Sequence, residues 1–339
     1  MSEKISSNPN DKEGKKFLRP QDFSSFSGQT KVKERLEDYV NVARNRNEPL
    51  GHLLLSGPSG LGKATLTYII ANEKRCSIKN ANGPLIETIG DLADLLTSLK
   101  KGDILFVDEI HRLNAAVEEG LCRAMENYFI DIMIDQGHGT SSVRLNIPRF
   151  TLIGSTMCED RLSIPLRSRF SLSLRLDYYT LEELQQIVQR SANILNIRIK
   201  PDGAYEIARR SRGTPRIANN LLRWTREYAS NAHGIITQEM ASEALSMLDI
   251  DDCGMDEMDK RILETITKQF LGGPVALNLL SVAVGEGADI MEDIYVPYLI
   301  QAGYLMRTVQ GLIATEKVWT WLGITPPKGK EKKDGTKDE

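Results

Sequence analysis

One stretch of this chain decides its fold: Leu53-Leu54-Leu55-Ser56-Gly57-Pro58-Ser59-Gly60-Leu61-Gly62-Lys63. Its first four residues predict a short buried strand, and a helix-like stretch follows from Lys63 to about Glu73. The glycine-rich turn between them fits the GxxxxGK pattern, which requires a strand before it and a helix after it. Glycines let backbone N–H groups close on phosphate oxygens, and Lys63 can reach the β- and γ-phosphates. We therefore interpret this turn as a binding loop for a nucleoside triphosphate rather than a plain glycine turn.

The residue after the lysine departs from this pattern. A Ser or Thr at that position binds Mg²⁺ through its hydroxyl, but this chain has Ala64, which cannot ligate a metal. Thr65 carries a hydroxyl one residue later, where the helix rotates it by about 100°. Mg²⁺ can still bind through phosphate oxygens, water and a carboxylate. Because metal ions assist phosphoryl transfer substantially, slowed hydrolysis with retained nucleotide binding stays open.

A second apolar run, residues 104–107, ends in the two carboxylates of Asp108 and Glu109. The carboxyl ends of parallel strands meet at one edge of a sheet, so this pair is expected beside the phosphate loop. Asp108 can then hold Mg²⁺ through water, and Glu109 can orient and deprotonate the attacking water. The alternative is an exposed strand end, which the neighbouring phosphate loop disfavours.

The rest of the chain predicts an α/β fold in which helices cover a parallel sheet. Further short apolar runs occur at 151–155 and 172–176, and apolar residues at helical spacing indicate an amphipathic helix at 31–46. Short strands that alternate with helical segments are typical of parallel sheets. From Leu181 onward the pattern is mostly helical, and breaks at 251–254 and 272–274 frame a last helical module.

Composition narrows the possible functions. The formal net charge is -3, so any contact with DNA must come from a local patch. No run approaches the ~18 apolar residues of a membrane span, and residues 1–16 lack the apolar stretch of a secretory signal. The four cysteines lie far apart, which predicts free thiols in a reducing cytoplasm. The polar arm at 1–17 and the polar tail at 325–339 are expected to be disordered.

Five strings together resemble the RuvB family, the bacterial AAA+ motors that drive branch migration of Holliday junctions. They are the phosphate loop and the segments 108–113 (DEIHRL), 151–156 (TLIGST), 165–170 (PLRSRF) and 212–219 (RGTPRIAN). The resemblance covers about residues 17–323, and DEIHRL and RGTPRIAN are specific to this family among AAA+ proteins. It implies an AAA+ P-loop domain with a parallel sheet at 18–178, a helical lid at 179–253 and a winged-helix DNA-binding domain at 254–324.

The resemblance also implies roles for single residues. Asp108 and Glu109 match the Walker B pair, Thr156 matches sensor 1 near the γ-phosphate, and Arg216 matches sensor 2 on the lid. Arg169 matches the arginine finger, which makes the catalytic set Lys63, Asp108, Glu109, Thr156, Arg169 and Arg216. The implied nucleotide-binding residues are Leu18, Arg19, Gly57, Gly60, Gly62, Lys63, Ala64, Thr65, Glu126, Asn127, Tyr128, Tyr179 and Arg216. The implied metal ligands are Asp108 and Thr65.

The family's activity is ATP-dependent translocation on DNA, with Mg²⁺, in recombination and repair. A finger supplied in trans places the active site between subunits, and the family's assembly is a hexameric ring around duplex DNA. The implied partners are Holliday-junction DNA and a RuvA-like protein.

Residues 130–145 predict a β-hairpin. Ile130, Ile132 and Ile134 alternate with polar residues, and Gly137 and Gly139 bracket a turn. In the resembling family this hairpin projects outward and docks on RuvA, for which alternating isoleucines would supply an apolar face. The alternative is an internal hairpin that packs on the chain's own core.

The last module resembles the family's winged-helix domain but departs from it in the wing. Residues 304–315 predict two short strands with a turn near Gln310-Gly311, after a helix whose apolar face carries Met258, Ile262, Ile266 and Phe270. The family's wing tends to read RTPRGR, whereas this chain has Arg307-Thr308-Val309-Gln310-Gly311-Leu312. We assign DNA contact to Arg307 and Leu312 in this wing. Each lost phosphate contact lowers the salt dependence by about one unit, which predicts weaker DNA binding.

Two other functions stay open. Ala64 and the depleted wing suggest a divergent ring subunit that binds ATP and DNA but hydrolyses slowly. ATP turnover with and without duplex DNA separates this function from an active translocase. Clamp loading by another kind of AAA+ protein is the third reading, against which DEIHRL and the hairpin argue.

Overall fold

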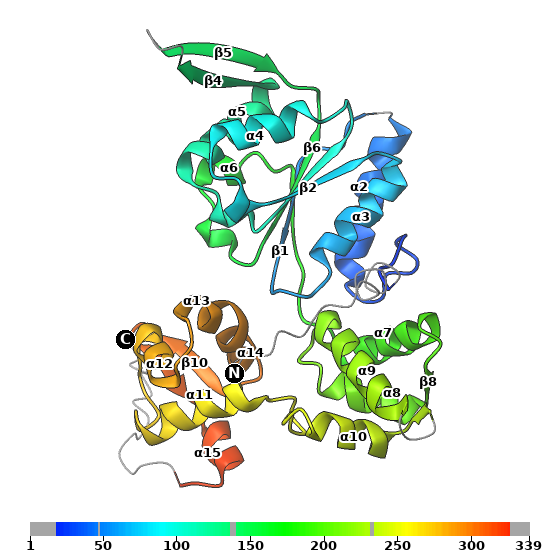
Figure 1. The fold of residues 1–339 in the computed structure, drawn as a ribbon, viewed down its shortest axis with the longest axis vertical. Coiled ribbons are helices and arrows are strands. Elements are labelled where there is room, and N and C mark those ends of the chain that lie inside the picture. Colours follow the sequence, from blue (N-terminus) through cyan, green and yellow to red (C-terminus); the bar gives the residue numbers. More distant parts are fainter. Residues whose placement is uncertain (1–17, 47, 136–139, 231–233, 326–339) are drawn as a thin grey trace, which may run out of the picture. The chain divides into compact units, whose positions relative to one another are not determined.

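The structure is a computed structural model that describes residues 18–46, 48–135, 140–230 and 234–325. The chain divides into two compact units, Met1–Gln238 and Glu239–Glu339 (Figure 1). The arm at 1–17, nearly all of the tail at 325–339 and the hairpin turn with Gly137 and Gly139 lie outside the described residues. Within the described ranges, no helix combines the length and the apolarity that crossing a bilayer requires.

The first unit contains a five-stranded parallel sheet, which confirms the predicted α/β fold. Its strands, in spatial order, are β2 (Ile78–Asn82), β3 (Ile104–Asp108), β6 (Thr151–Thr156), β1 (Leu53–Ser56) and β7 (Leu172–Arg175). Strands β1 and β6 are buried along their whole length, because helices cover both faces of the sheet. The sequence predicts every strand of this sheet except β2, where Lys79, Asn80 and Asn82 are exposed polar residues at the sheet edge.

Helices cover the two faces of the sheet (Figure 1). On one face lie α2 (Thr30–Asn45) and α3 (Lys63–Lys74), and on the other lie α4 (Ile89–Thr97), α5 (Ala115–Asn127) and α6 (Ile164–Arg167). Three 3₁₀ turns join them: η1 (Gly83–Leu85), η2 (Ile110–Arg112) and η3 (Glu159–Arg161). A capping box between Thr88 and Asp91 starts α4, and the Asn114 side chain caps α5. Because the sheet is parallel, the loop after β1, the acid pair after β3 and the end of β6 meet at one edge.

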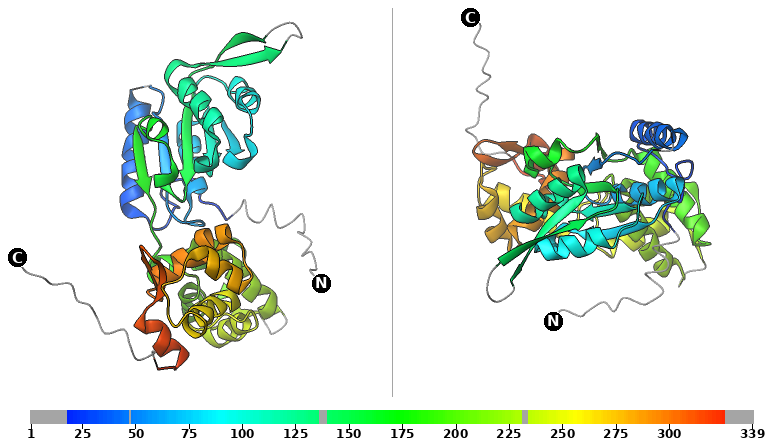
Figure 2. Two further views of the ribbon diagram at one scale, coloured as in Figure 1. Left: turned by 90° about the vertical axis from the view of Figure 1, so that its left-hand side faces the viewer. Right: turned by 90° about the horizontal axis from the view of Figure 1, so that it is seen from above.

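The predicted hairpin is present as β4 (Phe129–Asp135) and β5 (Thr140–Asn146), and it forms an arm at one end of the unit (Figure 2). Its apolar face is buried at the base: Ile130 belongs to the core of the unit, and Ile132 and Leu145 pack against that core. On the same face, Val143, which lies directly opposite Ile132, is exposed. The base of the hairpin at Ile130 therefore packs internally, and the exposed part of the apolar face begins at the level of Ile132, with Val143.

A helical lid follows the sheet. It consists of α7 (Leu181–Ile194), α8 (Pro201–Arg209) and α9 (Pro215–Ser230), together with a parallel two-strand pair, β8 (Arg198–Ile199) and β9 (Ile235–Ile236). A capping box between Thr180 and Glu183 starts α7, and Pro201 occupies the first turn of α8, where a missing N–H costs nothing. The lid begins at Tyr179, whose N–H donates to the carbonyl of Gly213 just before α9.

Most of the second unit is a winged helix. The unit begins with α10 (Gln238–Ser246), which precedes the winged helix. The winged helix comprises α11 (Glu257–Lys268), α12 (Leu277–Val284), α13 (Ala288–Ile290), the π-helical turn η4 (Met291–Tyr295), α14 (Val296–Gln301), β10 (Leu305–Thr308), β11 (Gly311–Ala314) and α15 (Glu316–Leu322). Strands β10 and β11 form the predicted two-stranded wing, and Val275 adds a bridge to Leu312. The core of this unit includes Ile262 and Ile266 from the predicted apolar face of α11.

Candidate nucleotide-binding site

The loop after β1 has a backbone that only glycine tolerates at its turning points. Gly57, Gly60 and Gly62 have φ values of 126°, 86° and 106°. A Cβ on Gly57 would also lie 2.3 Å from the carbonyl oxygen of Leu176, so a side chain there would collide with β7's continuation. The helix α3 begins directly after Gly62, and no side chain caps its first turn. Its N-terminal N–H groups and its dipole therefore face the loop, as an anion site requires.

Lys63 lies inside this loop rather than on the surface. Its side chain is 8% exposed, and its Nζ donates to the carbonyls of Gly57 at 2.6 Å and Pro58 at 2.8 Å. Burial lowers the pKa of Lys63 to about 8. The negative charges of Asp108 and Glu109 partly oppose this shift, and the positive charge of Arg216 adds to it. A bound phosphate would add negative charge beside the ammonium and raise this pKa again.

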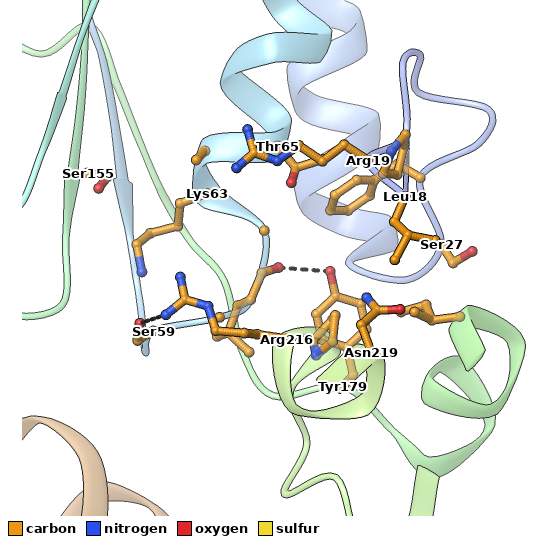
Figure 3. A pocket seen from close by; sticks show the side chains of 18 of the residues that line it. Leu18, Arg19, Ser27, Ser59, Lys63, Thr65, Ser155, Tyr179, Arg216 and Asn219 are labelled. Atoms are coloured by element: carbon orange, nitrogen blue, oxygen red, sulfur yellow. Dashed lines mark hydrogen bonds between the residues drawn. The ribbon is translucent and has the colours of Figure 1, made fainter. Parts of the chain in front are cut away.

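A cavity of about 680 Å³ opens in front of the loop, between the sheet edge and the lid (Figure 3). Most of the nucleotide-binding and catalytic residues implied by the sequence line it: Leu18, Arg19, Gly60, Gly62, Lys63, Ala64, Thr65, Asp108, Glu109, Thr156, Tyr179 and Arg216. Gly57 does not line the cavity, but its carbonyl accepts a hydrogen bond from Lys63. At the far end, Arg19 lies over the ring of Tyr68, with 5.2 Å between the guanidinium carbon and the ring centre. The carbonyl of Leu18 accepts a bond from Arg190 at 3.1 Å, so α7 of the lid holds the N-terminal segment against the cavity.

The acid pair lies at the end of β3, as the sequence predicts. The Ser155 hydroxyl, from the neighbouring strand β6, donates to Oδ1 of Asp108, and the N–H of Glu109 donates to the same oxygen at 3.1 Å. Glu109 itself adopts a left-handed backbone with φ of 52°, and its carboxylate pairs with Arg112 at 3.3 Å. The two carboxylates thus have different partners, which suits Asp108 for a metal ion and Glu109 for a water molecule.

Thr156 ends β6 beside this pair and is fixed by three bonds. Its Oγ1 lies 3.0 Å from the carbonyl oxygen of Cys158, 3.1 Å from the Cys158 nitrogen and 3.0 Å from Nδ1 of His111. A hydroxyl has one proton, so if Thr156 donates to the Cys158 carbonyl, then Nδ1 of His111 is the donor. His111 and Ser155 lie inside the quoted strings, but nothing in the sequence pattern indicates their contacts with Thr156 and Asp108. Ser155 positions Asp108 and His111 positions Thr156.

The lid contacts the phosphate loop at three successive residues. Arg216, at the start of α9, donates from Nη1 to the Ser59 hydroxyl at 2.9 Å and from its backbone to the Gly60 carbonyl at 3.4 Å (Figure 3). The Tyr179 hydroxyl donates to the carbonyl of Leu61 at 2.9 Å, and burial raises the pKa of this phenol. The position of the lid is therefore tied directly to the backbone that would hold the phosphates.

Four residues from the implied site lie elsewhere in the unit. Arg169 follows α6 outside the cavity and pairs with Glu126 at 2.8 Å. Glu126 and Asn127 end α5, and Tyr128 follows them with φ of 56°; none of the three lines the cavity. The Tyr128 ring lies under Arg149 at 5.3 Å instead. This chain alone does not bring these four residues to the nucleotide pocket.

The wing of the second unit carries little positive charge for contact with a DNA backbone. Arg307 is held by Glu292 of η4 through two bonds of 2.9 and 2.6 Å. Leu312 is 2% exposed, and its N–H and carbonyl both bond to Val275, so its side chain belongs to the core and cannot reach a DNA backbone. Residues 254–324 contain nine acidic and five basic side chains, a net charge of -4. Of the two assigned DNA contacts, Arg307 is about half exposed and paired with a carboxylate, and Leu312 is buried.

The sheet order, the glycine loop, the acid pair and a lid that touches the loop define an AAA+ P-loop ATPase. Three family models together match almost the whole chain: the Holliday junction DNA helicase RuvB P-loop domain at 18–176, the RuvB AAA lid domain at 179–251 and the RuvB C-terminal winged helix domain at 252–323. The chain belongs to the RuvB family.

Individual relatives agree with this family assignment. The chain is 50% identical over 325 residues to the Holliday junction branch migration complex subunit RuvB of Salinibacter ruber, covering 96% of this chain and 94% of that protein. It is also similar to the solved structure of the Thermotoga maritima RuvB Holliday junction branch migration motor, with a TM-score of 0.85 and 44% identity over 92% of this chain and all of that one. A mutant of the same motor gives a TM-score of 0.86 at 45% identity. Neither clamp loading nor a slowly hydrolysing subunit finds support among these matches.

Proposed function

We propose that this chain is the ATP-driven motor subunit that moves Holliday-junction DNA during branch migration. Membership of the RuvB family across all three modules supports this function. The observation that carries the mechanism is the contact of Arg216 and Tyr179 with the phosphate loop. A lid held on the loop by these bonds changes position when the phosphates change, so nucleotide turnover becomes domain motion.

ATP fits the cavity that the structure contains. The backbone around Gly57 leaves no room for a Cβ, and Lys63 and Arg216 supply positive charge at the phosphate end. Mg²⁺ would be held by Asp108 together with phosphate oxygens and water, because Ala64 offers no ligand. Thr65 lines the cavity one helical position further on and is its nearest hydroxyl on α3. When bound, Mg²⁺ neutralises charge on the transferred phosphoryl group; Glu109 would orient the attacking water.

The catalytic arginine would come from a second subunit. Arg169 does not line the cavity of its own chain, although the family assigns it to the nucleotide. A ring, in this family a hexamer, places each Arg169 at the next subunit's cavity, where a guanidinium can raise the rate by ~10³–10⁵. Ring assembly would therefore be required for turnover.

The partners follow from the other modules. The hairpin of β4 and β5 would dock on a RuvA-like protein with the part of its apolar face that begins at Val143. The winged helix would contact duplex DNA weakly, since Arg307 is its one wing arginine. We place the protein in the cytoplasm, where its four free cysteines would stay reduced.

A synthetic four-way junction tests this function. With ATP, Mg²⁺ and a RuvA-like partner, the wild type should convert a labelled junction into duplex products, and Lys63→Ala should not. If the wild type leaves the junction intact while hydrolysing ATP, the branch migration assignment is wrong. If it neither binds nor hydrolyses ATP, the motor assignment itself fails.

A further inference from the structure

We propose that Glu126 is a positioning residue for the arginine finger, so that it acts on catalysis through Arg169 rather than by touching the nucleotide. The inference rests on the proposed function, because it takes Arg169 as the group supplied to a neighbouring subunit. Glu126 lies in the last turn of α5, and its Oε1 is 2.8 Å from Nη2 of Arg169. It does not line the cavity of its own chain, where the resemblance had placed it.

Two contacts hold the guanidinium at separate nitrogens. Nη2 pairs with Glu126, and Nη1 donates to the carbonyl of Pro165 in α6. The third nitrogen, Nε, is buried and has no hydrogen-bond partner among the described residues. A guanidinium carries five N–H donors in one plane, so two anchors from different helices fix both its position and its tilt. The N–H groups left for a phosphate are then those on the outer side of Nη1 and Nη2.

The support behind these anchors is rigid. Helix α5 is capped by Asn114, and its residues Leu121, Ala124 and Met125 are buried in the core of the unit. Arg169 keeps only 21% of its side chain exposed, whereas Glu126 is 52% exposed. Because the carboxylate stays in contact with water, it can orient the arginine without the desolvation cost of a buried pair. Groups that are fixed in advance stabilise a transition state better than groups that must be ordered during the reaction.

The same exposure argues that this pair does little for stability, since ion pairs at a surface contribute little. The chain supplies a matched control on the same helix: Glu119 pairs with Arg123 at 2.5 Å, and both are more than half exposed. If the Glu126–Arg169 pair were only a surface ion pair, then removing either glutamate would have the same small effect.

The test is steady-state ATP turnover by full-length protein on duplex DNA, with Glu126→Ala, Glu126→Gln and Arg169→Ala, and with Glu119→Gln as control. We expect both Glu126 variants to lower kcat by about 10–100-fold, the range for a misplaced catalytic group, while KM for ATP stays within about twofold. Glu119→Gln should match the wild type. In the Arg169→Ala background, Glu126→Gln should cause no further loss, because residues that act through one another are not additive.

Mixed rings separate positioning from a general defect. A Glu126→Ala subunit keeps an intact cavity, and a Glu109→Gln subunit keeps an intact finger, so mixing the two should restore turnover. Mixing Glu126→Ala with Arg169→Ala should restore nothing, because neither supplies a working finger.

The outcomes separate the positioning role of Glu126 from the finger role of Arg169 on which it depends. Unchanged kcat in Glu126→Ala, with Arg169→Ala inactive, overturns the positioning role, as does a KM change that exceeds the kcat change. Normal turnover in Arg169→Ala overturns the finger and with it the proposed interface between subunits. If Glu126→Ala does not fold, Glu126→Gln, which keeps the size of the side chain, decides the question with the same readouts.

Discussion

The phosphate loop and the wing each contain a positive side chain to which we assign a phosphate contact, but they hold that side chain in opposite ways. Lys63 is bonded to two backbone carbonyls within a loop whose glycines allow no other conformation. Arg307 is bonded to the carboxylate of Glu292, a side chain from another element. Backbone partners change only if the fold changes, whereas a side-chain partner can be gained or lost by one substitution. The loop is therefore fixed by the architecture of the first unit, and the wing's affinity is adjustable.

The largest expected effect is on the loop side of this comparison. Lys63→Ala removes the charge-assisted bonds to the β- and γ-phosphates, each of which contributes about 1.5–3 kcal/mol. We expect the Kd for ATP to rise at least ~100-fold in a calorimetric titration. Lys74→Ala is the control, because Lys74 is on the same helix and bonds to the Glu48 carbonyl instead. An unchanged Kd in Lys63→Ala would remove the phosphate-loop assignment.

The depressed pKa of Lys63 gives a second, pH-dependent expectation. Only the protonated ammonium attracts phosphate, and the free protein holds it with a pKa of about 8. Well below pH 8 the ammonium is almost fully protonated, so the affinity should be nearly constant below about pH 7; above pH 8 most lysines are neutral and binding must also take up a proton. We expect the Kd for ATP to rise by about tenfold per pH unit once above this pKa, with matching proton uptake in buffers of different ionisation enthalpy. A Kd that is constant up to pH 9.5 would contradict the burial of this lysine.

The wing offers the reverse experiment, in which removing a charge should improve binding. Glu292→Gln removes the negative charge that pairs with Arg307, so the magnitude of the slope of log K against log salt should increase by about 0.9 and DNA affinity should rise by several-fold. Asp289→Asn removes the same charge from the preceding helix α13, and it should give a smaller gain that leaves the slope unchanged. Equal behaviour of the two variants in a fluorescence titration would show that Glu292 acts only through net charge.

The smallest expected effect concerns the bond between the lid and the loop. Tyr179→Phe removes the hydroxyl that donates to Leu61 and should cost about 0.5–1.5 kcal/mol. Because this bond ties the lid to the phosphate loop, we expect KM for ATP to rise by about two- to tenfold with the thermal midpoint nearly unchanged. A lower thermal midpoint with normal KM would assign Tyr179 to packing instead.

The phosphate loop could be predicted from the sequence more completely than the wing, because its structure depends on neighbouring residues and the wing's contacts depend on distant ones. The loop, the acid pair and the central strands are encoded locally, as apolar runs that lead into glycines or carboxylates. Edge strand β2 has no such apolar run, so the sequence does not predict it. In the wing, nothing near Arg307 indicates that its partner lies 15 residues earlier in η4. The burial of Leu312 depends on a bridge to Val275, which is also distant in the chain.

Glu126 shows the same limit inside the first unit. A family resemblance places it at a nucleotide, but it cannot say whose nucleotide or through which side chain. Only the three-dimensional structure shows that α5 ends beside Arg169 and away from the cavity of its own chain.

The most direct test of the central claim is Mg²⁺-dependent ATP turnover on four-way junction DNA, with a RuvA-like partner, by wild type and Arg169→Ala. We expect junction DNA to stimulate the wild type, and Arg169→Ala to bind ATP with normal affinity but to hydrolyse it at least ~10³-fold more slowly. Equal ATP turnover by the two proteins, or turnover that junction DNA does not stimulate, would contradict a motor whose active site is completed by a neighbouring subunit.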